Sequence, residues 1–211
     1  MRAICAFVVA AAVPAAEHEG LPLRQRQLQR NGFTILELLI VISIIIVLAG
    51  LILATSGYVQ KKGARSRAEA EIAAVSAALE NYKADNGIYP TNGDTEILDP
   101  SMDVDPSTAL PNKYSKSSLY LYEQLSGDSD GDRVVDQPKS YLPFKPNMLL
   151  PAPPSTATIL AMRDPFGNSY GYSTARAANP TGTVGFNPTF DLWSSAGGKT
   201  TAEIPQWIKN W

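Results

Sequence analysis

The side chains of this sequence that could do chemistry are almost all carboxylates. Its only cysteine, Cys5, and its only histidine, His18, lie within the first 31 residues. The rest of the chain therefore has no thiol nucleophile, no imidazole for a Ser-His-Asp arrangement, and no His or Cys ligand for zinc or copper. A metal ion bound there must accept oxygen ligands, which favours calcium or magnesium.

The densest group of carboxylates lies in the segment GDSDGDRVVD, residues 127 to 136. Its four aspartates are Asp128, Asp130, Asp132 and Asp136, and the carbonyl of Val134 is a further oxygen. The spacing resembles the first nine positions of a calcium loop of the EF-hand type. Two positions depart from that pattern, because Gly131 comes one place early and Lys139 stands where a bidentate Glu is expected. A calcium site and a solvated acidic loop therefore both remain open.

Carboxylate pairs can also perform acid–base catalysis, and two pairs qualify by residue type. These are Asp128 with Asp136, and Asp164 with Asp191. Nothing in the sequence places either pair in a cleft, and surface carboxylates are common. Serines also cluster, at Ser115, Ser117 and Ser118, but no base accompanies them. The sequence therefore predicts that the protein is not an enzyme.

One carboxylate, Glu37, lies inside an apolar segment. From Phe33 to Ala54 there are 22 residues, apolar except for Thr34, Glu37 and Ser43. As a helix the segment is about 33 Å long, which matches a hydrocarbon core of about 30 Å. An ionised group in hydrocarbon costs at least about 2.5 kcal/mol, so Glu37 calls for an explanation.

The residues before this segment carry two leader-like signals. Residues 1 to 20 resemble a secretory signal peptide, whereas residues 21 to 32 form a complete short leader with three arginines. A translation start placed too far upstream would explain the doubling, and N-terminal sequencing of the unprocessed protein would test it. The arginines favour a cytoplasmic leader and a C-terminal domain on the other side of the membrane, although further basic residues follow the span.

Helical periodicity continues past the apolar segment. One apolar stripe comprises Ala64, Ala68, Ile72, Val75, Leu79 and Tyr82. Asn86-Gly87 is a strong stop signal, and Pro90 follows it. We therefore predict one helix of roughly 50 residues, half in lipid and half amphipathic.

The remaining chain predicts a small antiparallel sheet preceded by an irregular region. Residues 88 to 163 are rich in Pro, Ser and Asp, with helical character only at 118–125 and an irregular or extended stretch at 143–154. Alternating apolar pairs follow, at Tyr170 and Tyr172, Val184 and Phe186, and Phe190 and Leu192. The expected fold class is α+β, a long N-terminal helix packed on a small antiparallel β-sheet.

The sequence RNG followed by FTILELLIVISIII resembles the N-terminus of type IV pilins and pseudopilins. The resemblance implies cleavage after Gly32 by a prepilin peptidase, and N-methylation of Phe33. It also implies that the carboxylate of Glu37 meets the terminal amine of a neighbouring subunit. Such a pair would relieve the cost of the buried charge and fix the axial stagger of adjacent helices. The alternative is a signal anchor with an incidental polar residue.

Further motifs indicate the branch of that superfamily. SAALENYKADNGIYPT (76–91) resembles the end of the long helix in the type II secretion protein G family, the major pseudopilins. RDPFGNSYGY (163–172), FDLWSSAGG (190–198) and IPQWIKNW (204–211) resemble its sheet turn, last strand and tail. In the turn, Asp164 and Asn168 are expected to act as caps and Gly167 to take positive φ. The disulfide that closes classical type IVa pilins is impossible here, which favours a pseudopilin.

The resemblance implies the following organisation of the chain: leader 1–32, transmembrane and polymerisation helix 33–54, amphipathic half-helix 55–87, variable insert 88–163, and C-terminal sheet and tail 164–211. Family members also hold calcium in the C-terminal loop. In this chain only Asp191 and Glu203 offer carboxylates there, which is a weak ligand set.

The expected function is that of a structural subunit of a type II secretion pseudopilus. The implied partners are other pseudopilins, the prepilin peptidase, an inner-membrane assembly platform with its ATPase, and membrane lipid. The implied location is the inner membrane, single-pass, with the C-terminal domain in the periplasm, and then the periplasmic fibre. A formal net charge of -2 gives no indication of a nucleic-acid partner. The alternative is a surface type IV pilin for adhesion, motility or DNA uptake.

Overall fold

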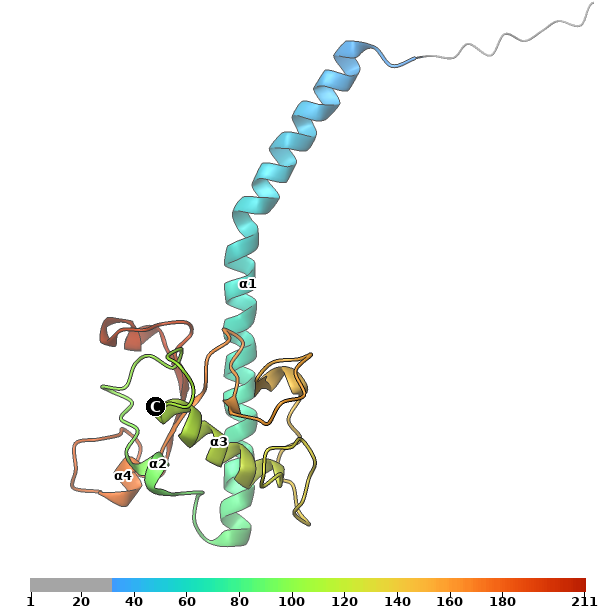
Figure 1. Ribbon diagram of the computed structural model, residues 1–211. Coiled ribbons are helices and arrows are strands. Elements are labelled where there is room, and N and C mark those ends of the chain that lie inside the picture. The colour runs from blue at the N-terminus through green and yellow to red at the C-terminus, as the bar shows by residue number, and fades with distance from the viewer. Residues whose placement is uncertain (1–31) are drawn as a thin grey trace, which may run out of the picture. The chain divides into compact units, whose positions relative to one another are not determined.

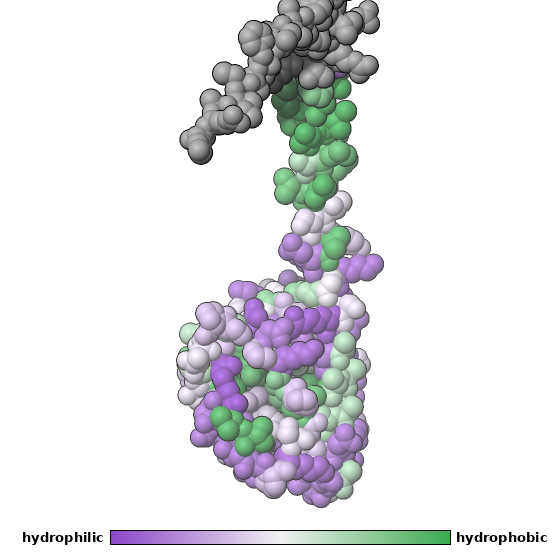
Figure 2. Space-filling model, turned by 90° about the vertical axis from the view of Figure 1, so that its right-hand side faces the viewer, coloured by the Kyte–Doolittle hydropathy of each residue, from purple (hydrophilic) through white to green (hydrophobic). Residues whose placement is uncertain are grey.

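A computed structural model describes residues 32–211, and its dominant element is the helix α1, Ile35–Asn86 (Figure 1). The chain forms two units, one ending at Leu48 and the other comprising Ala49–Trp211. In the first unit every described side chain is exposed, and most are large and apolar. Figure 2 shows this hydrophobic surface in green. By length and composition α1 is able to cross a membrane.

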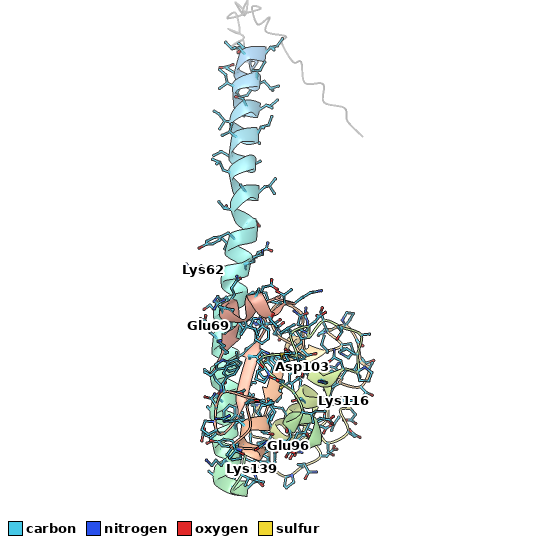
Figure 3. The ribbon with its side chains drawn as sticks, turned by 90° about the vertical axis from the view of Figure 1, so that its left-hand side faces the viewer. Lys62, Glu69, Glu96, Asp103, Lys116 and Lys139 are labelled. Atoms are coloured by element: carbon cyan, nitrogen blue, oxygen red, sulfur yellow. The ribbon has the colours of Figure 1, made fainter. Side chains whose placement is uncertain are left out.

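In the second unit α1 is amphipathic, as its periodicity predicts. Its buried residues are Ala68, Ile72, Val75, Ala78 and Leu79. Its exposed side chains are still mostly apolar up to Val59, and from Lys61 on they include many charged residues, such as Lys62 and Glu69 (Figure 3). The helix ends at the predicted stop, where Gly87 has φ +81° and its N–H donates to the carbonyl of Lys83 at 2.7 Å. Tyr89 then packs against the main core, and Pro90 is buried.

The remaining elements are short. In chain order they are α2 (Gly93–Glu96), α3 (Lys113–Ser126), η1 (Pro146–Met148), β1 (Leu149–Leu150), β2 (Ala161–Met162), β3 (Gly171–Ser173), α4 (Ala175–Ala178), β4 (Asp191–Ser194), η2 (Thr201–Gln206) and β5 (Ile208–Lys209). Strands β1 and β2 form an antiparallel pair. Strands β3, β4 and β5 form an antiparallel sheet in that order. This is the α+β architecture that the sequence predicts.

The main core joins the amphipathic half of α1 to α3 and the sheet. Leu79 from α1, Leu121 from α3 and Leu192 from β4 are fully buried in it. Polar contacts reinforce the packing at two points, because the Tyr170 hydroxyl donates to Glu71 at 2.8 Å and that of Tyr82 to Gln124 at 2.9 Å. The helix that would span the membrane therefore also forms one wall of the folded domain.

A second core cluster holds the C-terminal tail. It comprises Leu98, Tyr114, Trp193 and Trp207, with Trp193 and Trp207 stacked at 6.1 Å between ring centroids. Gly171 pairs with Trp193 across β3 and β4, and a Cβ at Gly171 would lie 2.2 Å from that indole. Only glycine therefore allows this ring to lie flat across the sheet.

Two local predictions need correction. Helical character begins at Lys113 and not near Ser118, because the side chain of Asn112 accepts from the N–H of Ser115 and completes a capping box. The alternating pair Val184 and Phe186 lies in the loop between α4 and β4 and in no strand.

That loop is held by the carboxylate of Asp191. It accepts hydrogen bonds from the N–H groups of Phe186 at 2.8 Å and Asn187 at 2.9 Å. Those donors are therefore unavailable to a strand ladder.

The turn before β3 has the predicted chemistry. One oxygen of Asp164 accepts from the N–H groups of Phe166 and Asn168, at 3.0 and 2.8 Å, and Gly167 has φ +97°. The other oxygen accepts from the Ser194 hydroxyl at 2.6 Å and so ties the turn to β4. Asp164 is 1% exposed, and its burial raises the pKa of the carboxyl despite these hydrogen bonds.

A raised pKa in the folded state gives a defined pH dependence of stability. The contribution is complete below the unfolded-state pKa of about 4 and is lost as pH rises through the folded pKa. We expect Asp164→Asn to remove this loss, so that the melting temperature of the wild type relative to that of the variant falls as the pH rises above about 4. Asp105→Asn is the control, because the Ser107 hydroxyl lowers the pKa of that carboxyl. Its effect should have the opposite sign, and equal profiles for all three proteins would contradict the account.

Candidate functional site

The first candidate site is the N-terminal end of α1, where Thr34 and Glu37 form a reciprocal cap. The Thr34 N–H and hydroxyl both donate to Oε2 of Glu37, at 2.8 and 3.0 Å. The Glu37 N–H donates to the Thr34 hydroxyl oxygen at 3.2 Å. Sequence reasoning placed Thr34 in the motif without assigning it this role. The T-x-x-E spacing of a capping box was the signal that could have revealed it.

The cap fixes the Glu37 side chain through Oε2 and leaves its other carboxylate oxygen, Oε1, available. Both hydrogen bonds that the carboxylate accepts go to Oε2. Within residues 32–211 the ion pairs are Arg65–Glu69, Arg67–Glu71, Lys113–Asp103 and Lys139–Asp85. None involves Glu37, so Oε1 can accept a further donor from outside this part of the chain.

The surroundings of Glu37 are apolar and uncovered. Phe33 is 86% exposed, and Ile35, Leu36 and Leu38 are also largely exposed. Gly32 is exposed as well and precedes the first helical turn in non-helical backbone. The bond between Gly32 and Phe33 is thus accessible in the structure, and a carboxylate lies one turn further along an otherwise apolar surface.

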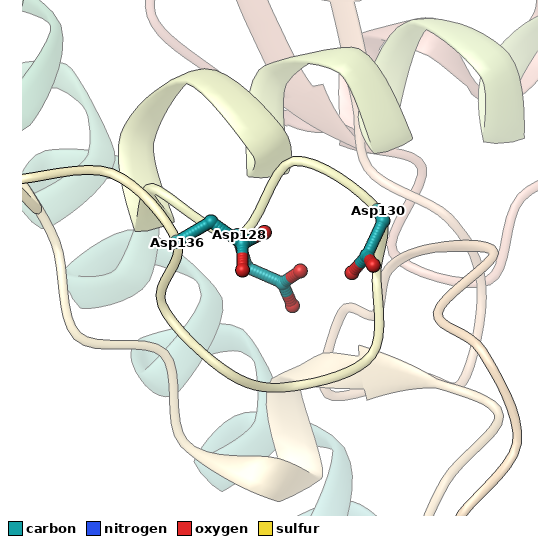
Figure 4. Close-up of side chains that lie close together, drawn as sticks. All are labelled: Asp128, Asp130 and Asp136. Atoms are coloured by element: carbon teal, nitrogen blue, oxygen red, sulfur yellow. The ribbon is translucent and has the colours of Figure 1, made fainter.

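The second candidate site is the acidic segment after α3. Asp128, Asp130 and Asp136 each offer one carboxylate oxygen within 4.8 Å of the others (Figure 4). Asp132, predicted as a fourth ligand, is outside this group. Its carboxylate instead accepts from the N–H of Val134 at 2.8 Å, which closes a local turn.

Asp128 is the structural centre of this loop. It is 1% exposed and accepts from the Tyr122 hydroxyl at 2.7 Å and from the N–H groups of Gly131 and Arg133, both at 2.8 Å. Burial, and the hydrogen bond to Asp128, raise the pKa of the Tyr122 phenol. Asp136 is exposed and accepts from the N–H and hydroxyl of Ser129. Much of the hydrogen-bonding capacity of these carboxylates is therefore used to shape the loop.

The chemistry of the donor set fits a hard cation. Three carboxylates supply part of the about six to eight oxygens that calcium prefers. In the described chain this is the one group of three or more potential ligands at such distances.

In the C-terminal loop the two candidate ligands are already hydrogen-bonded. Asp191 is buried and accepts two backbone N–H groups, as described above. Glu203 lies in η2, where its Oε2 accepts from the N–H groups of Lys199 and Thr200 and from the Thr200 hydroxyl. A metal site formed by these two residues stays a prediction.

The residues that could have indicated catalysis have structural partners. Asp164 holds a turn and Asp191 a loop, so both oxygens of each carboxylate accept structural hydrogen bonds. The Ser115 hydroxyl donates to the carbonyl of Asn112, and the Ser118 oxygen accepts from the N–H of Met162. Ser117 donates to the carbonyl of Tyr172. Ser115 therefore caps α3, and Ser117 and Ser118 join it to β3 and β2.

The fold and the N-terminal site together define a class of protein. A long helix, apolar and then amphipathic, is packed through its second half on a small antiparallel sheet. A glutamate occupies the fifth position counted from Phe33. This is the type IV pilin-like fold.

Comparisons with known proteins identify the family. The chain is 42% identical over 114 residues to the type II secretion system core protein G of Klebsiella michiganensis, covering 54% of this chain and 78% of that protein. It is 38% identical over 86 residues to the protein of the same name from Escherichia coli (strain K12), covering 40% of this chain and 59% of that protein. No family model and no solved structure gives a match. The chain belongs to the family of type II secretion system core protein G.

The hydrogen bonds of the acidic loop predict unequal effects of its aspartates on stability. Asp128→Ala leaves the Tyr122 hydroxyl and two N–H groups without their acceptor, so we expect a loss on the order of 3 kcal/mol in the free energy of unfolding. Asp130→Ala removes one exposed contact, to the N–H of Asp132, and should cost less than about 1 kcal/mol. Urea unfolding of the full chain in an uncharged detergent measures both. Equal losses would contradict the assignment of Asp128 as the structural residue.

Proposed function

We propose that this chain is a structural subunit of a type II secretion pseudopilus. It polymerises through α1, and the growing fibre drives protein export across the outer membrane. The observation that carries the proposal is Glu37, which is fixed by Thr34 and lacks an ion-pair partner in the described part of its own chain. The names of the relatives support the secretion role. They do not favour the alternative of a surface pilin for adhesion, motility or DNA uptake.

Assembly follows from the energetics of a charge in lipid. A single subunit carries the carboxylate of Glu37 in an apolar segment, at a cost of at least about 2.5 kcal/mol. Cleavage after Gly32 creates a positive amine on Phe33. When the amine of one subunit meets the Glu37 carboxylate of the next, each charge is compensated. The pair also sets the axial stagger between neighbouring helices, because the two groups are at fixed positions on each helix.

The partners and location follow from this role. A prepilin peptidase cleaves after Gly32 and methylates Phe33, and an inner-membrane platform with its ATPase adds subunits to the fibre. Before assembly the chain is a single-pass inner-membrane protein with its C-terminal domain in the periplasm. The apolar, exposed first unit and the arginines that precede it support this placement.

Replacing the carboxylate tests the proposal. Glu37→Ala should be inserted and cleaved normally but yield at least tenfold less fibre, because the amine of the neighbouring subunit has no partner. The matched control is Ser43→Ala, which removes an uncharged polar group of the same segment, whose hydroxyl donates to the carbonyl of Ile40 in its own helix. Mass spectrometry of the mature terminus verifies processing, and sheared fibres are quantified by immunoblot. Normal fibre yield from a correctly processed Glu37→Ala would contradict the proposal.

We propose in addition that the group of Asp128, Asp130 and Asp136 binds calcium. Saturating calcium, at about 100 times its Kd, should then stabilise the full chain by about 2.7 kcal/mol, a rise of several degrees in melting temperature. Asp130→Asn should weaken this response, whereas Asp105→Asn should leave it unchanged. Magnesium, which demands a tighter octahedral site, should be less effective. A melting temperature that does not change with calcium up to millimolar concentration would contradict the site.

A further inference from the structure

A cleft of about 750 Å³ opens in the second unit beside the first polar turns of α1. Its lining includes Tyr58, Lys61, Lys62 and Arg65 from α1, and Ser195 and Glu203 from the C-terminal region. Neither the pseudopilin function nor the acidic loop uses these residues.

The charge of the cleft is predominantly positive. Lys61 and Lys62 are exposed, and neither forms an ion pair within the described residues. Arg65 lies 3.4 Å from Glu69 and donates to the carbonyl of Gln206 at 2.7 Å. The carboxylate in the lining, Glu203, already accepts three hydrogen bonds. Those from the Lys199 N–H and the Thr200 hydroxyl lower its pKa most. Arg65 is thus partly compensated by Glu69, whereas Lys61 and Lys62 contribute positive charge to the lining without an ion pair in the described residues.

A buried donor without a partner also belongs to this cleft. Ser195 is 2% exposed, and its hydroxyl makes no hydrogen bond in the structure. It begins a tight turn in which the N–H of Gly198 donates to the Ser195 carbonyl at 2.8 Å, with Ala196 and Gly197 both at positive φ. A buried hydroxyl without a partner costs on the order of 1 to 3 kcal/mol. An oxygen of a bound ligand would remove that cost.

We propose that this cleft binds the phosphate of an anionic phospholipid headgroup. Lys61 and Lys62 supply the charge, and the Ser195 hydroxyl donates to a phosphate oxygen. The apolar side chains in the lining, such as Phe166 and Ala196, suit the first carbons of the acyl chains. The site would hold the C-terminal domain against the membrane surface while α1 anchors the subunit, before it enters a fibre.

The position of the basic residues along α1 selects lipid as the occupant. Tyr58 follows Ala54, the last residue of the apolar segment, by four positions, and Lys61 follows it by seven. At about 1.5 Å per residue, Lys61 is about 10 Å beyond the segment, within reach of the headgroup layer. Tyrosine is also enriched at that interface. This reasoning rests on the proposed function, in that α1 must span the membrane.

The test uses the full chain in an uncharged detergent, titrated with short-chain phosphatidylglycerol, phosphatidylcholine or inorganic phosphate. Melting temperature and tryptophan fluorescence report binding, because the indole of Trp207 lies next to Gly198, which lines the cleft. We expect phosphatidylglycerol to raise the melting temperature by several degrees at concentrations where phosphatidylcholine has no effect. Phosphatidylcholine acting equally well would overturn the proposal. Inorganic phosphate acting as well as phosphatidylglycerol would overturn the assignment to lipid.

Variants locate the site. Lys61→Gln combined with Lys62→Gln should weaken phosphatidylglycerol binding at least tenfold. The charge-matched control, Lys116→Gln with Lys145→Gln, replaces two exposed lysines away from the cleft and should bind normally. Ser195→Ala should weaken binding about threefold without lowering the melting temperature of the lipid-free protein, since its hydroxyl has no partner to lose. Normal binding by the Lys61/Lys62 variant would overturn the proposal.

The outcome is independent of pseudopilus assembly. Binding is measured on single chains in detergent, without cleavage after Gly32 and without contact between subunits. A failure to bind lipid would leave the role of Glu37 untouched. If the Lys61/Lys62 variant bound lipid normally but formed no fibres, the basic residues would belong to a contact between subunits and the lipid site would be refuted.

Discussion

The charge on Glu37 is the constraint on which the rest of this account depends. An ionised carboxylate in hydrocarbon is unfavourable until a cation compensates it, and within the described residues no cation pairs with Glu37. Thr34 holds the side chain at the first turn of the helix but binds only one of its oxygens. The remaining oxygen calls for a donor from another molecule. The terminal amine released by cleavage after Gly32 has the charge and the position to meet it.

The folded domain comprises residues 49–211 and includes the second half of α1. The same α1 that exposes apolar side chains in its first unit buries Ala68, Val75 and Leu79 in its second, against α3 and the sheet. The acidic loop and the basic cleft each combine one buried polar side chain, Asp128 or Ser195, with exposed charged residues.

The sequence predicted those features that local patterns determine. The 3.6-residue period and the Asn86-Gly87 stop defined α1, and the Asp164 turn followed from its residue types. Features that depend on contacts between distant residues could not be read in this way. Phe186 alternates like a strand residue, yet the carboxylate of Asp191 binds its N–H and keeps it in a loop. In the sequence Asp128 cannot be distinguished from the aspartates near it. In the structure it is buried and accepts a hydrogen bond from the Tyr122 hydroxyl of α3. The basic cleft forms only when residues 58–65 and 195–206 come together.

Zero-length cross-linking of assembled fibres tests the central claim most directly. Fibres grown from a mixture of light and heavy isotope-labelled subunits would be treated with a hydrophobic carbodiimide, which joins a carboxylate to an adjacent amine, and analysed by mass spectrometry. The account predicts an amide between Glu37 of one chain and the terminal amine of Phe33 of another, seen as hybrid light–heavy peptides. Intact fibres that yield this amide only within single chains, or join Glu37 to a different amine, would contradict it.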